Sequence, residues 1–302
     1  MRFLITGGTG LIGKKIVEKL LHRGDKVNVL SRKRNFNSQN KNLKFYYWNP
    51  ESGLIDEKSL DGVGVVINLA GTPIAQFWTR KVKKSILLSR INSVKTLSRV
   101  ILKNKKHKIK MFLNASAIGI YPSKKNVIFE ESQKHYSKTF LGNVVNEWEK
   151  KIDLISDQNI PFSILRIGLV LSNHSGFLKS LSISTRFYLG TWFGKGDNYY
   201  SWIHIEDLVN SIVYISDNKL YGTYNLVSPN PVKSKFFIEK LAKYLKRKII
   251  LPPIPTKIIK YFANDMSELL LFDQNVSCKK ILSTKFKFKY DSLDLAFKNL
   301  LK

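Results

Sequence analysis

The feature that most constrains this chain is the stretch TGGTGLIG at residues 6–13, which places three spaced glycines directly after a short apolar run. The run at residues 3–5 is too short for a helix and is typical of a buried strand, whereas apolar residues between positions 16 and 21 recur at helical spacing. The sequence therefore predicts a strand, a glycine-rich turn and a helix in that order.

Each spaced glycine has a distinct expected use. Gly7 permits a tight turn, Gly10 lets a ligand approach the backbone, and Gly13 lets the helix pack closely on the strand. The first amides of the following helix lack intrahelical partners and carry a partial positive charge, so they suit a pyrophosphate. Glycines at this spacing also serve ordinary turns and caps, but the strand–turn–helix context favours a dinucleotide site. The residues predicted to form it are Gly7, Gly8, Thr9, Gly10, Leu11, Ile12 and Gly13.

A second strand is expected at residues 26–30 and is followed by Ser31 and Arg32. The end of this strand meets the adenosine ribose in dinucleotide-binding folds, where a basic residue accommodates a 2′-phosphate. The sequence therefore favours NADP as the cofactor. The alternative is one more solvated basic cluster in a lysine-rich chain.

Strands and helices alternate along the next part of the chain. An alternation of this kind implies parallel βαβ units, so the predicted fold class is α/β, with a Rossmann-like, doubly wound parallel sheet. Small residues at the end of the fourth strand, Asn68, Leu69, Ala70 and Gly71, are expected beside the adenosine. Further strands are predicted at 43–48, 64–69, 110–114 and 162–167, and helices at 81–103, 141–156, 176–188 and 266–272; residues 285–290 (KFKFKY) are interpreted as an edge strand or extended tail.

Composition limits the other possibilities. With 302 residues, 43% of them hydrophobic, the chain can bury a sizeable core, and a single cysteine, Cys278, excludes an intrachain disulfide framework. The absence of a leader pattern and of a long apolar run predicts a cytoplasmic protein without membrane insertion.

The net charge of +29 can mark a nucleic-acid binder. However, the basic residues are mostly lysines spread along the whole chain, which a compositional bias at tolerant surface positions explains at least as well. A nucleic-acid partner is therefore the less favoured interpretation, and a small-molecule substrate is expected.

Several separated motifs resemble one family. TGGTGLIG, NLAG, SAIGIYP and SWIHIEDL resemble the extended short-chain dehydrogenase/reductases of the NAD(P)-dependent epimerase/dehydratase superfamily. FLGNVVNEWEK, LRIGLVLS and ELLLFDQNVSCKKIL look more specifically like its "epimerase family protein", or nucleoside-diphosphate sugar epimerase-like, group.

The resemblance covers nearly the whole chain and implies how it is divided. It implies an NADP-binding Rossmann-like domain at 1–170, with return elements at about 200–228, and a mostly substrate-side region at 171–302. It also implies that Ser31 and Arg32 hold the 2′-phosphate, that Arg90 lies near the cofactor and that Val170 lines the nicotinamide side.

The catalytic positions depart from the family pattern. Active members use a Tyr and a Lys four residues later, but Leu141 and Val145 occupy these positions, and neither side chain can move a proton. Ser116 and Tyr121 are the candidate substitutes, although the nearest lysine, Lys125, lies beyond a proline. The alternative for Tyr121 is a packing residue of the turn.

Other polar residues are weaker candidates. Trp148 and Glu149 occupy the family's "WE" position, where core packing and a structural hydrogen bond are the simpler interpretations. His204 and Asp207, in SWIHIEDL, are interpreted as structural support ahead of catalysis. With His107 and His135 in lysine-rich stretches, no metal-ligand cluster is predicted.

Three function classes follow. The favoured one is an NADP-dependent oxidoreductase or epimerase acting on a small hydroxyl- or carbonyl-bearing molecule, with nucleotide sugars as one class. The second is an NADP-binding sensor or scaffold with little catalysis, because the Tyr and Lys are missing. The third is a nucleic-acid-associated basic protein.

Overall fold

The computed structural model describes residues 1–34, 38–104, 107–133 and 136–301. The chain forms two compact units, each assembled from three segments. The first unit comprises Met1–Ser116, Val144–Leu165 and Val209–Thr223, and the second comprises Ala117–Asn143, Arg166–Leu208 and Tyr224–Lys302.

The main sheet has eight strands in the order β12-β8-β6-β5-β1-β2-β3-β4. The ladders β1–β2, β1–β5, β2–β3 and β5–β6 are parallel, and the short β4 is antiparallel to β3. The strands are β1 (Arg2–Thr6), β2 (Lys26–Ser31), β3 (Leu43–Asn49), β4 (Leu54–Ile55), β5 (Val65–Asn68), β6 (Met111–Ala117), β8 (Phe162–Ile167) and β12 (Gly222–Leu226). The predicted α/β fold with a large parallel sheet is confirmed.

The strand order explains where a ligand site forms. From β1 the chain adds β2 and β3 on one side and β5 and β6 on the other, so the direction of winding reverses beside β1. In open parallel sheets, ligands bind at the carboxyl ends of the strands next to such a reversal. β1 and β5 are almost completely buried, which agrees with their continuous apolar sequence.

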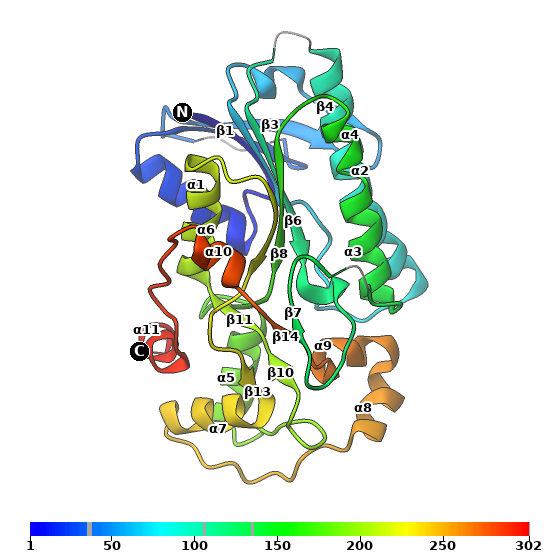
Figure 1. Cartoon of the computed structure of the whole chain (residues 1–302), viewed down its shortest axis with the longest axis vertical. Coiled ribbons are helices and arrows are strands. Elements are labelled where there is room, and N and C mark those ends of the chain that lie inside the picture. The colour runs from blue at the N-terminus through cyan, green and yellow to red at the C-terminus, as the bar shows by residue number, and fades with distance from the viewer. Residues whose placement is uncertain (35–37, 105–106, 134–135, 302) are drawn as a thin grey trace. The chain divides into compact units, whose positions relative to one another are not determined.

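The helices and short 3-10 turns of the first unit connect these strands. Helix α2 lies beside α4, where the Ser98 hydroxyl donates to the Leu154 carbonyl at 3.0 Å (Figure 1). The helix predicted at 141–156 is interrupted after Lys150 and continues as α4. The elements are α1 (Leu11–His22), η1 (Glu57–Leu60), α2 (Arg80–Lys103), α3 (Phe140–Lys150), α4 (Asp153–Ser156) and α6 (Ile205–Asp217), of which α3 and α6 also contribute residues to the second unit.

The second unit contains three small sheets and most of the C-terminal helices. Its core holds an aromatic cluster in which Phe237 contacts Phe177, Tyr200 and Phe297 at ring-centroid distances of 5.9, 5.7 and 5.3 Å. The paired strands are β7 (Ile128–Phe129) with β14 (Asn275–Val276), β9 (Leu169–Leu171) with β11 (Trp202–His204), and β10 (Tyr199–Tyr200) with β13 (Val232–Lys233). The helical elements are η2 (Ile118–Ile120), α5 (Phe177–Arg186), α7 (Ser234–Tyr244), α8 (Thr256–Ala263), η3 (Asn264–Ser267), α9 (Glu268–Leu271), α10 (Lys279–Ser283) and α11 (Leu293–Leu300).

Two sequence predictions in this unit need correction. Residues 285–290 form neither an edge strand nor a tail, because they are an irregular connection between α10 and α11. The backbone amides of Lys289 and Tyr290 donate to the Asp207 carboxylate instead of to a neighbouring strand. The helix predicted at 266–272 is divided between η3 and α9.

Candidate functional site

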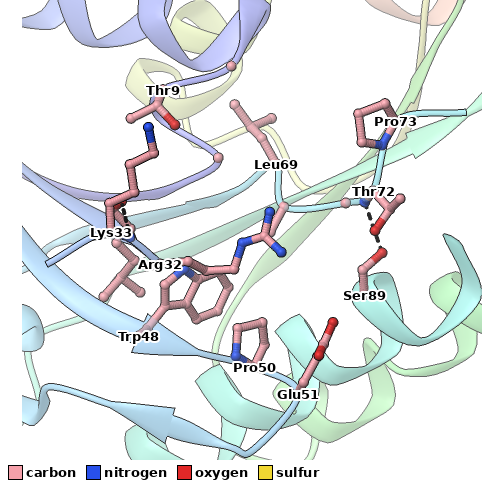
Figure 2. A pocket seen from close by; sticks show the side chains of 16 residues that line it. Thr9, Arg32, Lys33, Trp48, Pro50, Glu51, Leu69, Thr72, Pro73 and Ser89 are labelled. Atoms are coloured by element: carbon pink, nitrogen blue, oxygen red, sulfur yellow. Dashed lines mark hydrogen bonds between the residues drawn. The ribbon is translucent and has the colours of Figure 1, made fainter. Parts of the chain in front are cut away.

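A cavity of about 490 Å³ lies in the first unit where β1, β2 and β5 end (Figure 2). Its lining comes from the loops that follow these three strands, from the end of β3 and from helix α2. The lining residues are Gly7, Thr9, Gly10, Leu30, Ser31, Arg32, Lys33, Trp48, Pro50, Glu51, Leu69, Ala70, Gly71, Thr72, Pro73 and Ser89.

The glycine turn cannot accommodate side chains at its closest approaches. Gly7 has φ +67°, and a Cβ there would lie 2.8 Å from the Leu69 carbonyl oxygen. A Cβ on Gly13 would lie 2.2 Å from the Gly7 oxygen, and one on Gly8 would lie 2.8 Å from a Val29 methyl. Gly7 therefore serves the turn and Gly8 and Gly13 serve packing.

Gly10 is the N-cap of α1 and also lines the cavity. Among the described residues beyond its chain neighbours, a Cβ at this position would approach the Gly7 oxygen, at 3.3 Å. No side chain caps α1, and its first turn, which begins at Leu11 and Ile12, contains no acidic residue. This helix end keeps its partial positive charge beside the cavity, a suitable place for an anion.

Basic side chains follow β2 at the cavity wall. Figure 2 shows the Arg32 guanidinium pointing across the cavity and the Lys33 ammonium pointing toward Thr9. The Ser31 hydroxyl accepts a hydrogen bond from the Lys33 amide at 3.1 Å, which holds this turn. Arg34 lies outside the lining, over the Tyr47 ring at 4.5 Å. Two cations therefore project into the cavity.

The loop after β5 forms the opposite wall. The Thr6 hydroxyl accepts hydrogen bonds from the amides of Leu69 and Ala70, both at 3.0 Å, and donates to Asn68 Oδ1 at 2.6 Å. The Asn68 amide nitrogen donates to Asn114 Oδ1 at 2.7 Å and to Ser93. Asn68 is fully buried and outside the lining, so it holds the wall in place through this network while the residues after it line the cavity.

Arg90 supports the same wall from behind. Its guanidinium donates to the carbonyls of Thr72 and Ile86 at 3.2 and 2.8 Å and lies over the Trp148 ring at 5.2 Å. Burial lowers the pKa of Arg90 to about 10. A Cβ on Gly71 would approach this guanidinium to 3.1 Å, so the glycine leaves room for the arginine.

Several lining residues were absent from the sequence-based prediction. Trp48 lies near the end of β3 and Pro50 and Glu51 follow it, and the parallel pairing of β3 with β2 brings all three to the same sheet edge. Predicting these three residues required the order of the strands in the sheet, which places the end of β3 next to the end of β2. Ser89 required the orientation of α2, since it is adjacent in sequence to Arg90 but faces the cavity. Its hydroxyl accepts from the Thr72 amide at 2.9 Å (Figure 2).

The candidate catalytic residue Ser116 is buried near the end of β6, and its hydroxyl donates to the Glu149 carboxylate within the first unit. Val145, at the family's Lys position, is buried, and Leu141, at the Tyr position, is half-buried near the start of α3. Lys125 forms an exposed ion pair with Asp197 at 2.5 Å, so it is not placed to assist a tyrosine.

Tyr121 lies inside the second unit with no exposed surface. Its hydroxyl donates to Asn225 Oδ1 at 2.7 Å and accepts from Arg166 at 2.9 Å, while its ring stacks on Phe129. Burial raises the pKa of Tyr121, which favours the neutral phenol. These contacts are those of a structural tyrosine and support the packing alternative.

Tyr121→Phe is therefore expected to lower the free energy of unfolding by about 1–3 kcal/mol, because Asn225 Oδ1 loses a buried donor. Urea denaturation of the two proteins measures this difference. A variant as stable as the wild type would contradict the structural assignment.

Val170 lies in β9 of the second unit, half-buried and paired with Ile203 of β11. Its predicted position beside a nicotinamide stays a prediction.

His204 and Asp207 both stabilise the second unit's C-terminal connection. The neutral His204 ring accepts from the Glu206 amide at 3.1 Å, contacts Asn299 Oδ1 at 3.2 Å, and stacks on Tyr290 at 3.7 Å. The Asp207 carboxylate accepts a hydrogen bond from the Tyr290 amide at 2.8 Å. Burial lowers the pKa of His204 to about 4 and raises the pKa of Asp207.

This burial predicts a loss of stability in acid. His204 stays neutral in the folded state until about pH 4, but the unfolded chain takes up a proton near pH 6.5, so acid favours unfolding across that interval. Between pH 7 and pH 5 the wild type should lose about 2 kcal/mol more than His204→Gln. Urea denaturation at both pH values tests this, and parallel pH dependences would contradict it.

Two absences concern only the part of the chain that the structure describes. No group of three or more His, Cys, Asp or Glu side chains is arranged there for a metal ion. No described helix has the length and apolar content needed to cross a bilayer. His135 lies outside the described residues.

Two family models match the chain. The model described as the NAD dependent epimerase/dehydratase family matches residues 3–226, and a domain of unknown function matches residues 254–300. An epimerase family protein of Staphylococcus aureus strain MRSA252 is 32% identical over 304 residues, covering 99% of each chain.

Solved structures agree with this relationship. The human epimerase family protein SDR39U1, crystallised with NADPH, matches with a TM-score of 0.85 and 25% sequence identity. The match covers 99% of this chain and 99% of that one. A nucleoside-diphosphate sugar epimerase from Corynebacterium glutamicum has a TM-score of 0.79 and 27% identity, and the match covers all of this chain but 58% of that one. The resemblance found in the motifs is confirmed, and the chain belongs to the NAD dependent epimerase/dehydratase family.

Proposed function

We propose that this chain binds NADP(H) in the cavity of the first unit and uses it for hydride transfer at a hydroxyl- or carbonyl-bearing carbon of a small molecule. The observation that carries the proposal is the Arg32–Lys33 pair, which faces a cavity floored by a glycine turn. Two cations at the end of β2 suit the 2′-phosphate that distinguishes NADP from NAD. The NADPH in the human SDR39U1 crystal supports the same choice.

The residues present fit such a cofactor. The backbone at Gly7 and Gly10, next to the uncapped end of α1, would hold the pyrophosphate, and Ser31, Arg32 and Lys33 would hold the 2′-phosphate. The wall from Leu69 to Pro73 would bound the adenosine. When bound, the nicotinamide would accept a hydride from the substrate or return it.

For the substrate we propose a nucleotide-linked sugar as the first class to examine. The support is the similarity to the Corynebacterium glutamicum nucleoside-diphosphate sugar epimerase, which spans all of this chain.

A second candidate function is a cofactor-binding sensor or scaffold with little catalysis. The specific observation in its favour is that Leu141 and Val145 replace the family's proton-transferring pair, while Tyr121 is buried and engaged with Asn225 and Arg166. This candidate requires the same cofactor site and differs only in turnover.

Calorimetry with NADPH and NADH tests the cofactor proposal directly. We expect tighter binding of NADPH, and loss of binding in Gly10→Asp, which places a carboxylate beside the α1 amides. If neither nucleotide binds the wild type, the proposal is wrong. Loss of NADPH absorbance or conversion of sugar nucleotides then separates the two candidates: turnover supports the enzyme, whereas tight binding without turnover across a broad panel supports the sensor.

A further inference from the structure

We propose that a basic and apolar strip on the second unit docks this protein on an anionic lipid surface. The strip is defined as residues 186–189 and 243–263, which include helix α8 and lie far from the glycine turn in sequence. This inference does not depend on the cofactor site.

Helix α8 presents its apolar residues to solvent. Ile259 is its one buried residue, whereas Tyr261 and Phe262 are 79% and 72% exposed, and Ile258 is also exposed. Positions 258, 261 and 262 follow an i, i+3, i+4 pattern, so they share one face of the helix. The two aromatic rings contact each other edge to face at 5.2 Å. The three apolar side chains of this face are therefore exposed to water, and their transfer to an apolar environment would be favourable.

A second group of exposed apolar residues lies on two adjoining chain segments. The Arg247 side chain donates to the Arg186 carbonyl at 3.1 Å, and Thr191 donates to the Pro252 carbonyl at 2.9 Å, so the segments run side by side. Phe187 and Ile250 on these segments are 73% and 67% exposed. Leu189 and Leu251 are exposed as well, so these two segments supply a second group of exposed apolar side chains in the strip.

Charge within the strip decides which partner fits it. Residues 243–263 contain no Asp or Glu, and Lys257 and Lys260 are exposed on the same helix as the apolar residues of α8. The basic residues of this range are Lys243, Lys246, Arg247, Lys248, Lys257 and Lys260. Lysines are abundant throughout the chain, but here they coincide with exposed aromatic and aliphatic side chains. Helices that lie in a membrane interface combine these two properties, because the cations meet anionic headgroups while the apolar face enters the acyl boundary.

Two other occupants fit the strip less well. A second copy of this chain, paired through the same face, would bring one set of cations against another. A nucleic acid would satisfy the cations but would leave Ile250 and Ile258 in water. The lipid surface satisfies both the charge and the apolar groups.

The test is sedimentation of the full-length protein with large vesicles, made either of phosphatidylcholine alone or of equal amounts of phosphatidylcholine and phosphatidylglycerol. We expect binding only to the anionic vesicles, weakened by added salt. Tyr261→Ser with Phe262→Ser, and separately Lys257→Gln with Lys260→Gln, should each lower the partition coefficient at least about tenfold. These side chains are exposed, so the variants should keep wild-type melting temperatures.

Leu102→Ser and Lys95→Gln on α2 are the matched controls, because both positions are exposed and lie in the first unit. They should bind vesicles as the wild type does. The proposal is overturned if the wild type does not sediment with anionic vesicles, or if the controls lose as much binding as the strip variants. It is also overturned if Tyr261→Ser with Phe262→Ser dissociates a dimer in sedimentation equilibrium, or abolishes duplex DNA binding, without changing vesicle binding.

Discussion

Gly13→Ala should weaken binding of both NADPH and NADH by roughly a hundredfold, or about 3 kcal/mol, and should also destabilise the first unit. The added methyl would lie 2.2 Å from the Gly7 oxygen and 2.7 Å from the Gly8 Cα, and both of these are backbone atoms that no rotamer change can move away. Relief requires α1 to move away from β1, which displaces the helix end and the turn together. Calorimetry with each nucleotide and urea denaturation measure the two effects.

Gly64→Ala is the matched control, since the atoms nearest its methyl would be in the flexible Met1 side chain, at 3.5 and 3.7 Å, and the Arg2 carbonyl, at 3.9 Å. This variant should bind both nucleotides as the wild type does. If Gly13→Ala retains wild-type affinity, the glycine turn does not hold the pyrophosphate and the cofactor proposal loses its anchor.

Arg32→Ala combined with Lys33→Ala should lower NADPH affinity by about a hundredfold while changing NADH affinity by no more than about threefold. A hydrogen bond to a charged group contributes about 1.5–3 kcal/mol, and only NADPH offers the additional phosphate to these two cations. The difference between the nucleotides is the informative quantity, because a general disturbance of the cavity would weaken both. Titration calorimetry at constant ionic strength measures it.

Arg34→Ala provides the comparison within the same basic segment. Arg34 lies over the Tyr47 ring and outside the cavity, so its removal should leave the NADPH-to-NADH ratio unchanged. If all three basic residues contribute equally, the effect comes from general positive charge at the end of β2 and not from direct contact with the 2′-phosphate.

Local sequence patterns predicted the nucleotide-binding half of the fold well. The predicted strand at 162–167 matches β8, and the strands predicted at 26–30 and 43–48 extend by one residue each in β2 and β3. Each is a short apolar run closed by turn residues, so the information lies within a few neighbouring positions. The uses of Gly7 and Gly13 were predictable for the same reason, because a missing Cβ is a property of the residue itself.

Sequence reasoning failed where long-range partners decide the structure. The alternating pattern of residues 285–290 is typical of a strand, but the amides of Lys289 and Tyr290 donate to the Asp207 carboxylate, which is 82 and 83 positions earlier in the chain. Similarly, Asn68 is the last residue of β5, beside the cavity, yet its side chain forms hydrogen bonds with Thr6, Ser93 and Asn114. A buried amide must satisfy its hydrogen bonds, and the partners that do so are known only once the strands are side by side.

The amino-acid sequence by itself determined the longer strands and helices of the nucleotide-binding half, the glycine turn and the basic residues after β2, since these depend on residue type and on spacing over a few positions. Only the tertiary structure decided that Trp48, Glu51 and Ser89 share one cavity and that Tyr121 is enclosed by Asn225 and Arg166. It also decided that the apolar face of α8 is left exposed. Burial and contact depend on which distant segments pack together, and that choice follows from the free energy of the whole fold.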